Sequence, residues 1–193
     1  RVLRESGWYQ KEGRKEPNLL ALLDLVALGT VCDVVPLVGL NRAFVSQGLK
    51  VMGRRNNPGL VALADVARVD SKLSEYHAGF LLGPRVNAGG RVGEAPMGAR
   101  LLMTQDSAEA VEIAQRLDAW NTERREIEAQ VQEEAMAQVE GSGLSDALIV
   151  ASGEGWHPGV IGIVAGRLKE RFNRPAFVIG FDGDTGKGSG RSV

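Results

Sequence analysis

The chain has 193 residues, of which 44% are hydrophobic and 24% charged, and its formal net charge is −1. This length suits one large domain or two small ones with a buried core. The bulk charge is not that of a strongly basic nucleic-acid-binding protein, so such a function must rest on locally placed Arg and Lys. The lone cysteine, Cys32, excludes an internal disulfide and favours a reducing, cytoplasmic compartment. No apolar run approaches the roughly 20 residues that span a bilayer.

The first half of the chain is typical of short helices. Pro17 opens the apolar run Leu19–Leu28, which predicts a helix buried on more than one side and ended by Gly29. We expect residues 30–37 to be a loop or extended segment. Further helices are expected over the following ranges: 40–54, 59–67, 74–82 and 96–103.

The longest periodic stretch covers residues 106–139 and contains no Gly or Pro. Its composition of good helix formers predicts one amphipathic helix, long enough to connect two domains. Its apolar stripe comprises Ala110, Ile113, Ala114, Leu117, Trp120, Ile127 and Val131. The opposite, solvated side is expected to carry Glu123, Arg124, Arg125, Glu126, Glu128, Glu133 and Glu134. We expect Gly141-Ser142-Gly143 to end the helix.

The pattern then changes to alternating strands and helices. Residues 147–151 and 176–179 read as buried strands, with a helix from about 160 to 172 between them and a possible third strand from 188. This order predicts a parallel β-α-β unit. The predicted fold class is therefore α/β but mostly helical, divided into residues 1–103, a connecting helix over 104–141, and an α/β part over 142–193.

Two segments of the helical part are candidates for chemistry. Asp33 lies between apolar residues just after a buried helix, where a carboxylate needs a cation, hydrogen-bond donors or a metal. Its residue type alone favours a capping or ion-paired role over a metal ligand. Residues 82–91 read as an irregular glycine-rich stretch in which Arg85, Asn87 and Arg91 either bind phosphate or pair with local acids.

Two more candidates lie in the α/β part. Residues 153–162 join a strand to a helix N-terminus, a natural anion site, and contain His157 together with Trp156, which either stacks on a base or packs. Residues 186–192 include Ser189 and Arg191, and they read as a phosphate-binding loop or a glycine-rich hairpin turn. The spacing there does not fit a Walker A loop. His77 lies in a helical stretch and is expected to be structural.

Taken together, these segments resemble the RecJ exonucleases of the DHH phosphoesterase family. Residues 23–37 look like the fourth conserved block of the DHH domain, and residues 83–91 are similar to the block after it. Residues 155–165, Arg174-Pro175 and residues 188–192 look like the DHH-associated domain. Cys32 and Gly89 stand where the family often has Ala, and both remain small. The blocks occur in the family's order from about residue 17 to the end.

The resemblance implies a metal-dependent exonuclease that digests single-stranded DNA from its 5′ end in recombination and repair. By the same resemblance, Asp33 would bind Mn²⁺ or Mg²⁺, and Arg85, Asn87 and Arg91 would face substrate phosphates. Ser189 and Arg191, with His157 nearby, would hold the DNA terminus. The long helix would set the distance between metal and phosphate sites. Implied partners are single-stranded DNA and, further, a single-stranded-DNA-binding protein and a RecQ-type helicase.

The family's first three blocks, including the Asp-His-His motif that names it, do not occur in this sequence. Both ends read as cuts through a longer protein, so we expect these 193 residues alone to be inactive or nearly so. Two alternatives stay open. One is another DHH phosphodiesterase, acting on oligoribonucleotides or cyclic dinucleotides, and the other is a non-catalytic module that binds a replication complex.

Overall fold

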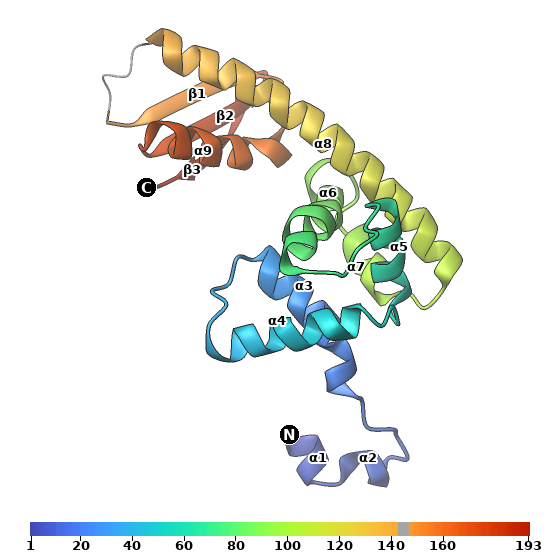
Figure 1. The fold of residues 1–193 in the computed structure, drawn as a ribbon. Coiled ribbons are helices and arrows are strands. Elements are labelled where there is room, and N and C mark those ends of the chain that lie inside the picture. The colour runs from blue at the N-terminus through green and yellow to red at the C-terminus, as the bar shows by residue number, and fades with distance from the viewer. Residues whose placement is uncertain (143–146) are drawn as a thin grey trace.

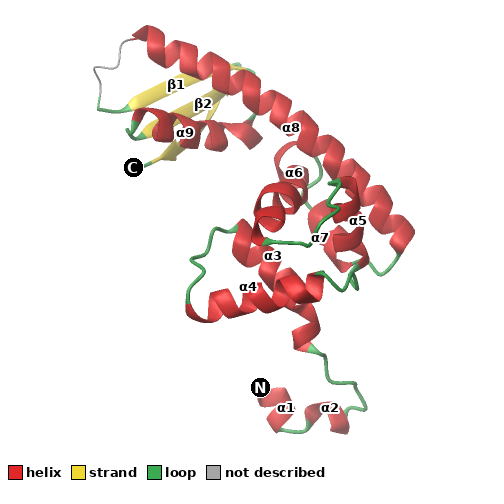
Figure 2. Ribbon diagram, in the orientation of Figure 1, coloured by secondary structure: helices red, strands yellow, loops and turns green. Residues whose placement is uncertain are grey.

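The computed structural model describes residues 1–142 and 147–193, which form helices through most of the chain and strands only near its end (Figures 1 and 2). The first two helices, α1 (Val2–Glu5) and α2 (Trp8–Lys11), contain no buried residue. Figure 1 shows them standing away from the rest of the chain. Among the described residues, no helix combines the length and apolarity needed to cross a membrane.

A helical unit follows, packed around one core. Its elements are η1 (Leu19–Leu22), α3 (Leu23–Cys32), α4 (Gly39–Met52), α5 (Pro58–Val66), η2 (His77–Leu82), α6 (Gly83–Val92) and α7 (Met97–Met103). Leu63, Leu82 and Leu101 are fully buried at its centre. Asn57 begins α5 as a helix cap, because its side chain accepts a hydrogen bond from the Leu60 N–H at 3.0 Å.

Helix α8 (Ser107–Ser142) belongs to both halves of the molecule and runs along them as a spine (Figure 1). Its predicted apolar stripe is confirmed, since Ile113 and Leu117 enter the core of the helical unit and Val131 enters a second core. The helix continues through Gly141 to Ser142, within the segment Gly141-Ser142-Gly143 that was expected to end it. Gly143 lies outside the described residues.

The α/β unit comprises the end of α8 with β1 (Ile149–Glu154), α9 (Pro158–Phe172), β2 (Ala176–Asp182) and β3 (Thr185–Arg191). The strand order is β1-β2-β3, with β1 parallel to β2, which confirms the predicted β-α-β unit, and β3 antiparallel to β2. One sheet face, with Ala151 and Val178, is buried with α8 and α9 in a single core. The other face leaves Val150 and Phe177 exposed.

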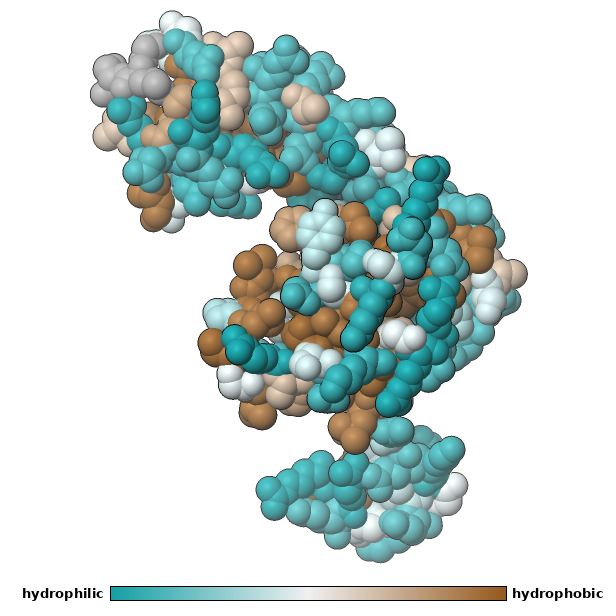
Figure 3. Space-filling model, in the orientation of Figure 1, coloured by the Kyte–Doolittle hydropathy of each residue, from teal (hydrophilic) through white to brown (hydrophobic). Residues whose placement is uncertain are grey.

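The structure corrects two helix boundaries near Asp33. Residues 19–22 form a 3₁₀ turn, and α3 continues through Gly29 to Cys32, so Gly29 does not end it. The helix continues because nothing at Gly29 requires a left-handed conformation. Leu19 is 59% and Leu20 71% exposed, whereas Ala27 and Leu28 are buried, so part of this apolar run faces solvent. Figure 3 shows apolar surface on this part of the molecule.

Candidate phosphate-binding site and metal-binding carboxylate

Asp33 follows the last turn of α3 and is exposed. Its backbone N–H donates to the Gly29 carbonyl oxygen at 3.0 Å, and Val34 after it has a positive φ of 54°. The turn carries the carboxylate outward into solvent, where it does not need a partner to offset burial. No hydrogen bond or ion pair to this carboxylate occurs within the described residues. Burial, and secondarily the Asp33 charge, raises the pKa of the Cys32 thiol.

An apolar pocket of about 430 Å³ opens beside this turn. It is lined by Val34 and Pro36 from the turn, and by Tyr76 and Phe80, whose rings stack with centroids 5.2 Å apart. Carboxylate oxygens suit Mg²⁺ and Mn²⁺, and an exposed, unpaired Asp33 fits the role of one ligand. The described residues contain no group of three or more His, Cys, Asp or Glu that could hold a metal. Asp33 by itself therefore does not form a metal centre.

Residues 83–92 form helix α6, so the irregular stretch predicted there is wrong. Tertiary packing explains why a glycine-rich segment is helical. A Cβ on Gly83 would overlap the Cys32 sulfur, and one on Gly89 would lie 2.7 Å from the Glu94 carbonyl oxygen. Glycine is used here for close approach between elements, and the lost helix propensity is offset by packing.

The three polar candidates of α6 have different surroundings. Arg85 is 16% exposed, and it donates from Nε to Asp118 Oδ1 of α8 at 2.7 Å and from Nη1 to the Leu81 carbonyl oxygen at 2.8 Å. Asn87 is exposed. Arg91 donates from Nη1 to the carbonyl oxygen of Gly159 at 3.1 Å. Arg85 is thus held within the helical unit, whereas Arg91 reaches the first turn of α9.

The N-terminus of α9 is organised by His157. Its Nδ1 accepts a hydrogen bond from the Gly159 N–H at 3.0 Å, which makes His157 the helix cap and leaves the proton of a neutral ring on Nε2. Trp156 is 6% exposed, and its indole N–H donates to Glu134 Oε2 at 2.6 Å. Of the two possibilities left open for Trp156, the structure therefore shows packing.

Ser189 and Arg191 belong to β3, an edge strand, which confirms the possible third strand from residue 188 and replaces the loop or hairpin turn read over residues 186–192. The antiparallel ladder to β2 imposes the extended conformation despite the glycines. Arg191 donates from Nη1 to Ser189 Oγ at 3.1 Å and to the Gly190 carbonyl oxygen at 2.8 Å. A Cβ on Gly162 would lie 3.0 Å from both Arg191 Nη2 and Ser189 Oγ. Both side chains therefore lie over the second turn of α9.

These contacts gather four of the predicted residues around one helix end. Gly159 and Gly162 are three residues apart and share a face of α9. Arg91 meets that face at Gly159, Arg191 and Ser189 meet it at Gly162, and His157 caps it. The positive end of the helix dipole and two guanidinium groups repel one another, so an anion bound between them is favoured. Neither arginine forms an ion pair with a described acid.

Sequence reasoning missed a buried polar cluster on α8. Arg124 and Glu128 form an ion pair with both side chains 13% exposed, and Arg124 Nη2 donates to Asn121 Oδ1 at 2.9 Å. Assigning Arg124 and Glu128 to the solvated side was wrong, although their i, i+4 spacing fits a pair. Burial lowers the pKa of the Arg124 guanidinium, Glu128 opposes this, and Arg91 and Arg125 add to the lowering. The cluster therefore lies within the electrostatic reach of Arg91.

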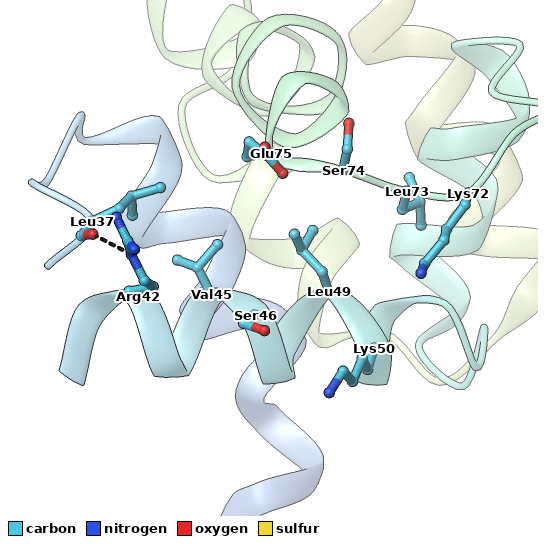
Figure 4. Close-up of a pocket in the computed structure, with 10 residues that line it drawn as sticks. All are labelled: Leu37, Arg42, Val45, Ser46, Leu49, Lys50, Lys72, Leu73, Ser74 and Glu75. Atoms are coloured by element: carbon cyan, nitrogen blue, oxygen red, sulfur yellow. Dashed lines mark hydrogen bonds between the residues drawn. The ribbon is translucent and has the colours of Figure 1, made fainter. Parts of the chain in front are cut away.

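A separate pocket of about 580 Å³ lies between α4 and residues 72–75 (Figure 4). It has aliphatic walls that include Val45 and Leu49, with Lys50 and Lys72 at one end. Arg42 at the other end donates from Nε to the Leu37 carbonyl oxygen at 3.0 Å. No residue predicted to bind metal or phosphate lines this pocket.

His77 holds the segment beside that pocket. Its Nδ1 accepts a hydrogen bond from the Ser74 N–H at 3.1 Å, and Nε2 lies 3.4 Å from Ser71 Oγ. The prediction that His77 is structural agrees with these contacts.

Comparison with known protein families first identifies the class of the C-terminal domain. Residues 145–193 match the DHHA1 domain, the domain that contains α9, Ser189 and Arg191. The whole chain then matches the single-stranded-DNA-specific exonuclease RecJ of Dickeya dadantii, with 48% identity over 99% of this chain and 34% of that protein. RecJ of Escherichia coli is 45% identical over the same shares, and that of Bacillus subtilis 44% identical over 89% and 22%.

Solved structures give the same result. RecJ from Thermus thermophilus in complex with Mg²⁺ superposes with a TM-score of 0.82 at 36% identity, covering 96% of this chain and 28% of that one. A manganese-bound exonuclease RecJ superposes with a TM-score of 0.80 at 35% identity, covering 96% and 45%. In sequence and in fold the chain belongs to the RecJ family. It spans about a third of the length of the first curated relatives it matches.

Proposed function

We propose that this chain is part of a metal-dependent exonuclease that hydrolyses single-stranded DNA from its 5′ end. The observation that carries the proposal is the convergence of Arg91, Ser189 and Arg191 on the capped N-terminus of α9. Such a site suits a terminal phosphate, which presents two negative charges and several acceptor oxygens. The relationship to proteins named as single-stranded-DNA-specific exonucleases supports the choice of substrate.

Asp33 provides one carboxylate of the metal site in this proposal. Bound Mn²⁺ or Mg²⁺ would polarise the scissile phosphate and lower the pKa of an attacking water. The relatives solved with Mg²⁺ and with manganese support a divalent metal. Further ligands for such an ion would come from outside the described residues, since these contain no group of three or more His, Cys, Asp or Glu that could hold a metal.

The remaining residues bind and orient the strand. Ser189 Oγ and the Arg191 guanidinium hold the terminal phosphate. The positive charge of Arg91 helps to balance the negative charge of that phosphate. His157 donates from Nε2, because Nδ1 is used by the Gly159 N–H. Asn87 is exposed on α6, one turn before Arg91, and contacts the next phosphate. Arg85 binds the strand through Nη2, the guanidinium nitrogen that does not donate to Asp118 or to the Leu81 carbonyl oxygen.

The polarity of the reaction follows from the two sites. A phosphate held at α9 and a metal held at Asp33 lie in different units, which α8 joins. A chain end that fits the phosphate site therefore presents its first phosphodiester bond to the metal, while an internal stretch of strand does not. We infer a place in DNA recombination and repair in the cytoplasm, alongside a single-stranded-DNA-binding protein and a RecQ-type helicase.

The test is product analysis with a protein of the relatives' full length that contains this segment. Single strands labelled at either end, with and without a 5′-phosphate, are incubated with Mn²⁺ or Mg²⁺. We expect stepwise release from the 5′ end, and loss of the preference for a 5′-phosphate in Arg191→Ala. Cleavage of dinucleotides or cyclic dinucleotides with no action on long single strands would favour another DHH phosphodiesterase. The absence of any turnover would favour a binding module.

A further inference from the structure

The helical unit and the α/β unit touch directly where α6 ends and α9 begins. Besides the shared spine α8, this contact pairs Arg91 of α6 with Gly159 of α9. The Arg91 Nη1 donates to the Gly159 carbonyl oxygen at 3.1 Å. The Arg91 carbonyl oxygen also lies close to Gly159. A Cβ added to Gly159 would lie less than 3.0 Å from that oxygen and overlap it. The approach is thus one of backbone to backbone.

Three glycines of α9 differ in what a methyl group would meet. At Gly159 it meets the backbone of another helix, which can yield only if α6 and α9 separate. At Gly162 it meets the ends of two side chains, Arg191 and Ser189, which can swing aside. At Gly166 it meets nothing within 4 Å. None of the three has a positive φ, so alanine itself causes no backbone strain at any of them.

We propose that the contact between Gly159 and Arg91 sets the separation of the metal-binding carboxylate and the phosphate site, which makes Gly159 a positioning residue. Asp33 is fixed to the helical unit, and Ser189 and Arg191 are fixed to α9. A shift of α9 against α6 therefore changes where a bound 5′ end places its first phosphodiester bond. This inference rests on the proposed exonuclease function.

The shift needed is small, but a reaction between positioned groups is sensitive to it. Relieving the overlap at Gly159 requires a separation of about 1 Å, and a misplacement of that size can cost about 100-fold in rate. The spine α8 is a single helix and resists larger movements, so the two units stay folded and joined. Ser189, Arg191 and His157 move as one body with α9, whereas Arg91 stays with α6.

The test compares Gly159→Ala, Gly162→Ala and Gly166→Ala in a full-length protein that contains this segment. For Gly159→Ala we expect kcat to fall by about 100-fold on 5′-phosphorylated and 5′-hydroxyl strands alike, with KM nearly unchanged on the 5′-hydroxyl strand, where no terminal phosphate depends on Arg91. For Gly162→Ala we expect KM to rise for the 5′-phosphorylated strand only, because the phosphate-holding side chains are displaced. Gly166→Ala should match the wild type on both substrates.

Thermal unfolding identifies a Gly159→Ala protein that fails to fold, and Arg91→Ala and Arg91→Lys then carry the test. Arg91→Ala removes the donor to Gly159 and should lower kcat even on 5′-hydroxyl strands, which have no terminal phosphate. Arg91→Lys retains a donor and should restore part of the lost kcat. The inference is overturned if folded Gly159→Ala behaves like Gly166→Ala, or if its defect vanishes on 5′-hydroxyl strands. Failure of the proposed function is a separate result, seen as an inactive wild type.

Discussion

Arg85 of α6 and Asp118 of α8 are joined by a hydrogen-bonded ion pair, with 2.7 Å between Nε and Oδ1. The arginine side chain is 16% exposed and the aspartate side chain 36% exposed, so solvent screens the pair only in part. The pair ties α6, which bears Asn87 and Arg91, to the spine of the molecule.

Arg85→Ala is therefore expected to destabilise the fold by about 1–2 kcal/mol, since it removes a charged hydrogen bond and leaves the Leu81 carbonyl oxygen without its donor. Urea unfolding of the wild type, Arg85→Ala, Asp118→Ala and the double variant measures the coupling between the two. If Arg85 also binds the strand, Arg85→Ala loses DNA affinity beyond that of Asp118→Ala. Unchanged stability with lost DNA affinity would contradict the structural part of this role.

The carboxylate of Glu134 should make stability depend on pH in acid. The hydrogen bond from Trp156, and secondarily that from Gln130, lowers the pKa of Glu134 below its usual value of 4.5. A lowered folded-state pKa gives stability that is present above the unfolded-state pKa and is lost as pH falls through the folded-state value. Glu134→Gln should therefore be less stable than the wild type at pH 7, with the difference shrinking as the pH falls below 4.5 and through the lower folded-state pKa.

Tryptophan fluorescence during urea unfolding at pH 3, 5 and 7 measures this difference. Glu109 provides a control, because hydrogen bonds from Thr104 and then Arg100 lower its pKa in the same direction. Glu109→Gln should show the same pH dependence without changing the emission of folded Trp156. An equal stability deficit for Glu134→Gln at all three pH values would show that its charge is not involved.

Two glycines of adjacent helices should respond oppositely to alanine. Gly48 of α4 lies against α3, where a Cβ would overlap the Leu23 carbonyl oxygen and the Ala27 side chain. Gly48→Ala should therefore destabilise the helical unit by about 1–3 kcal/mol through overpacking. Gly29 of α3 is exposed with nothing within 4 Å of an added Cβ, so Gly29→Ala should stabilise by up to about 1 kcal/mol. Thermal and urea unfolding of both variants tests the pair.

Glycines at close contacts between helices also show why part of the fold could be predicted from sequence and part could not. The stripe on α8 and the order of strands around α9 follow from periodicity, which depends only on the chain itself. The helical state of residues 83–92 depends on what Gly83 and Gly89 approach in space, and no local pattern records that. Propensity alone therefore favoured a loop there.

The candidate site divides in the same way. His157, Ser189 and Arg191 could be found from the sequence because binding residues are common in the segments that connect strands and helices. The structure brings all three to one end of α9. The contact of Arg91 with Gly159 spans 68 positions in sequence and has no local signal. Burial of the Arg124–Glu128 pair was likewise hidden, because charged residues on a helix are usually solvated.

Asp33 should matter for catalysis and not for stability. Its side chain is exposed and forms no hydrogen bond or ion pair within the described residues, so Asp33→Asn is expected to change the unfolding free energy by less than about 0.5 kcal/mol. In a full-length protein, loss of a charged metal ligand should lower Mn²⁺-dependent turnover at least about 100-fold. Glu75, an exposed acid lining the pocket beside Asp33, provides the matched control, and Glu75→Gln should retain activity.

The isolated 193-residue chain also tests whether Asp33 alone is enough for a working metal site. Because one carboxylate cannot hold Mn²⁺ in a catalytic geometry, this chain should show no turnover of 5′-phosphorylated single strands, even at millimolar Mn²⁺. It should still bind the 5′-phosphorylated end more tightly than a 5′-hydroxyl end, since the proposed phosphate-binding residues Arg91, Ser189 and Arg191 all lie within it. Arg191→Ala should abolish that difference in a fluorescence-anisotropy titration. Clear turnover by the isolated chain would mean that the metal site lies within these residues and that Asp33 has partners among them.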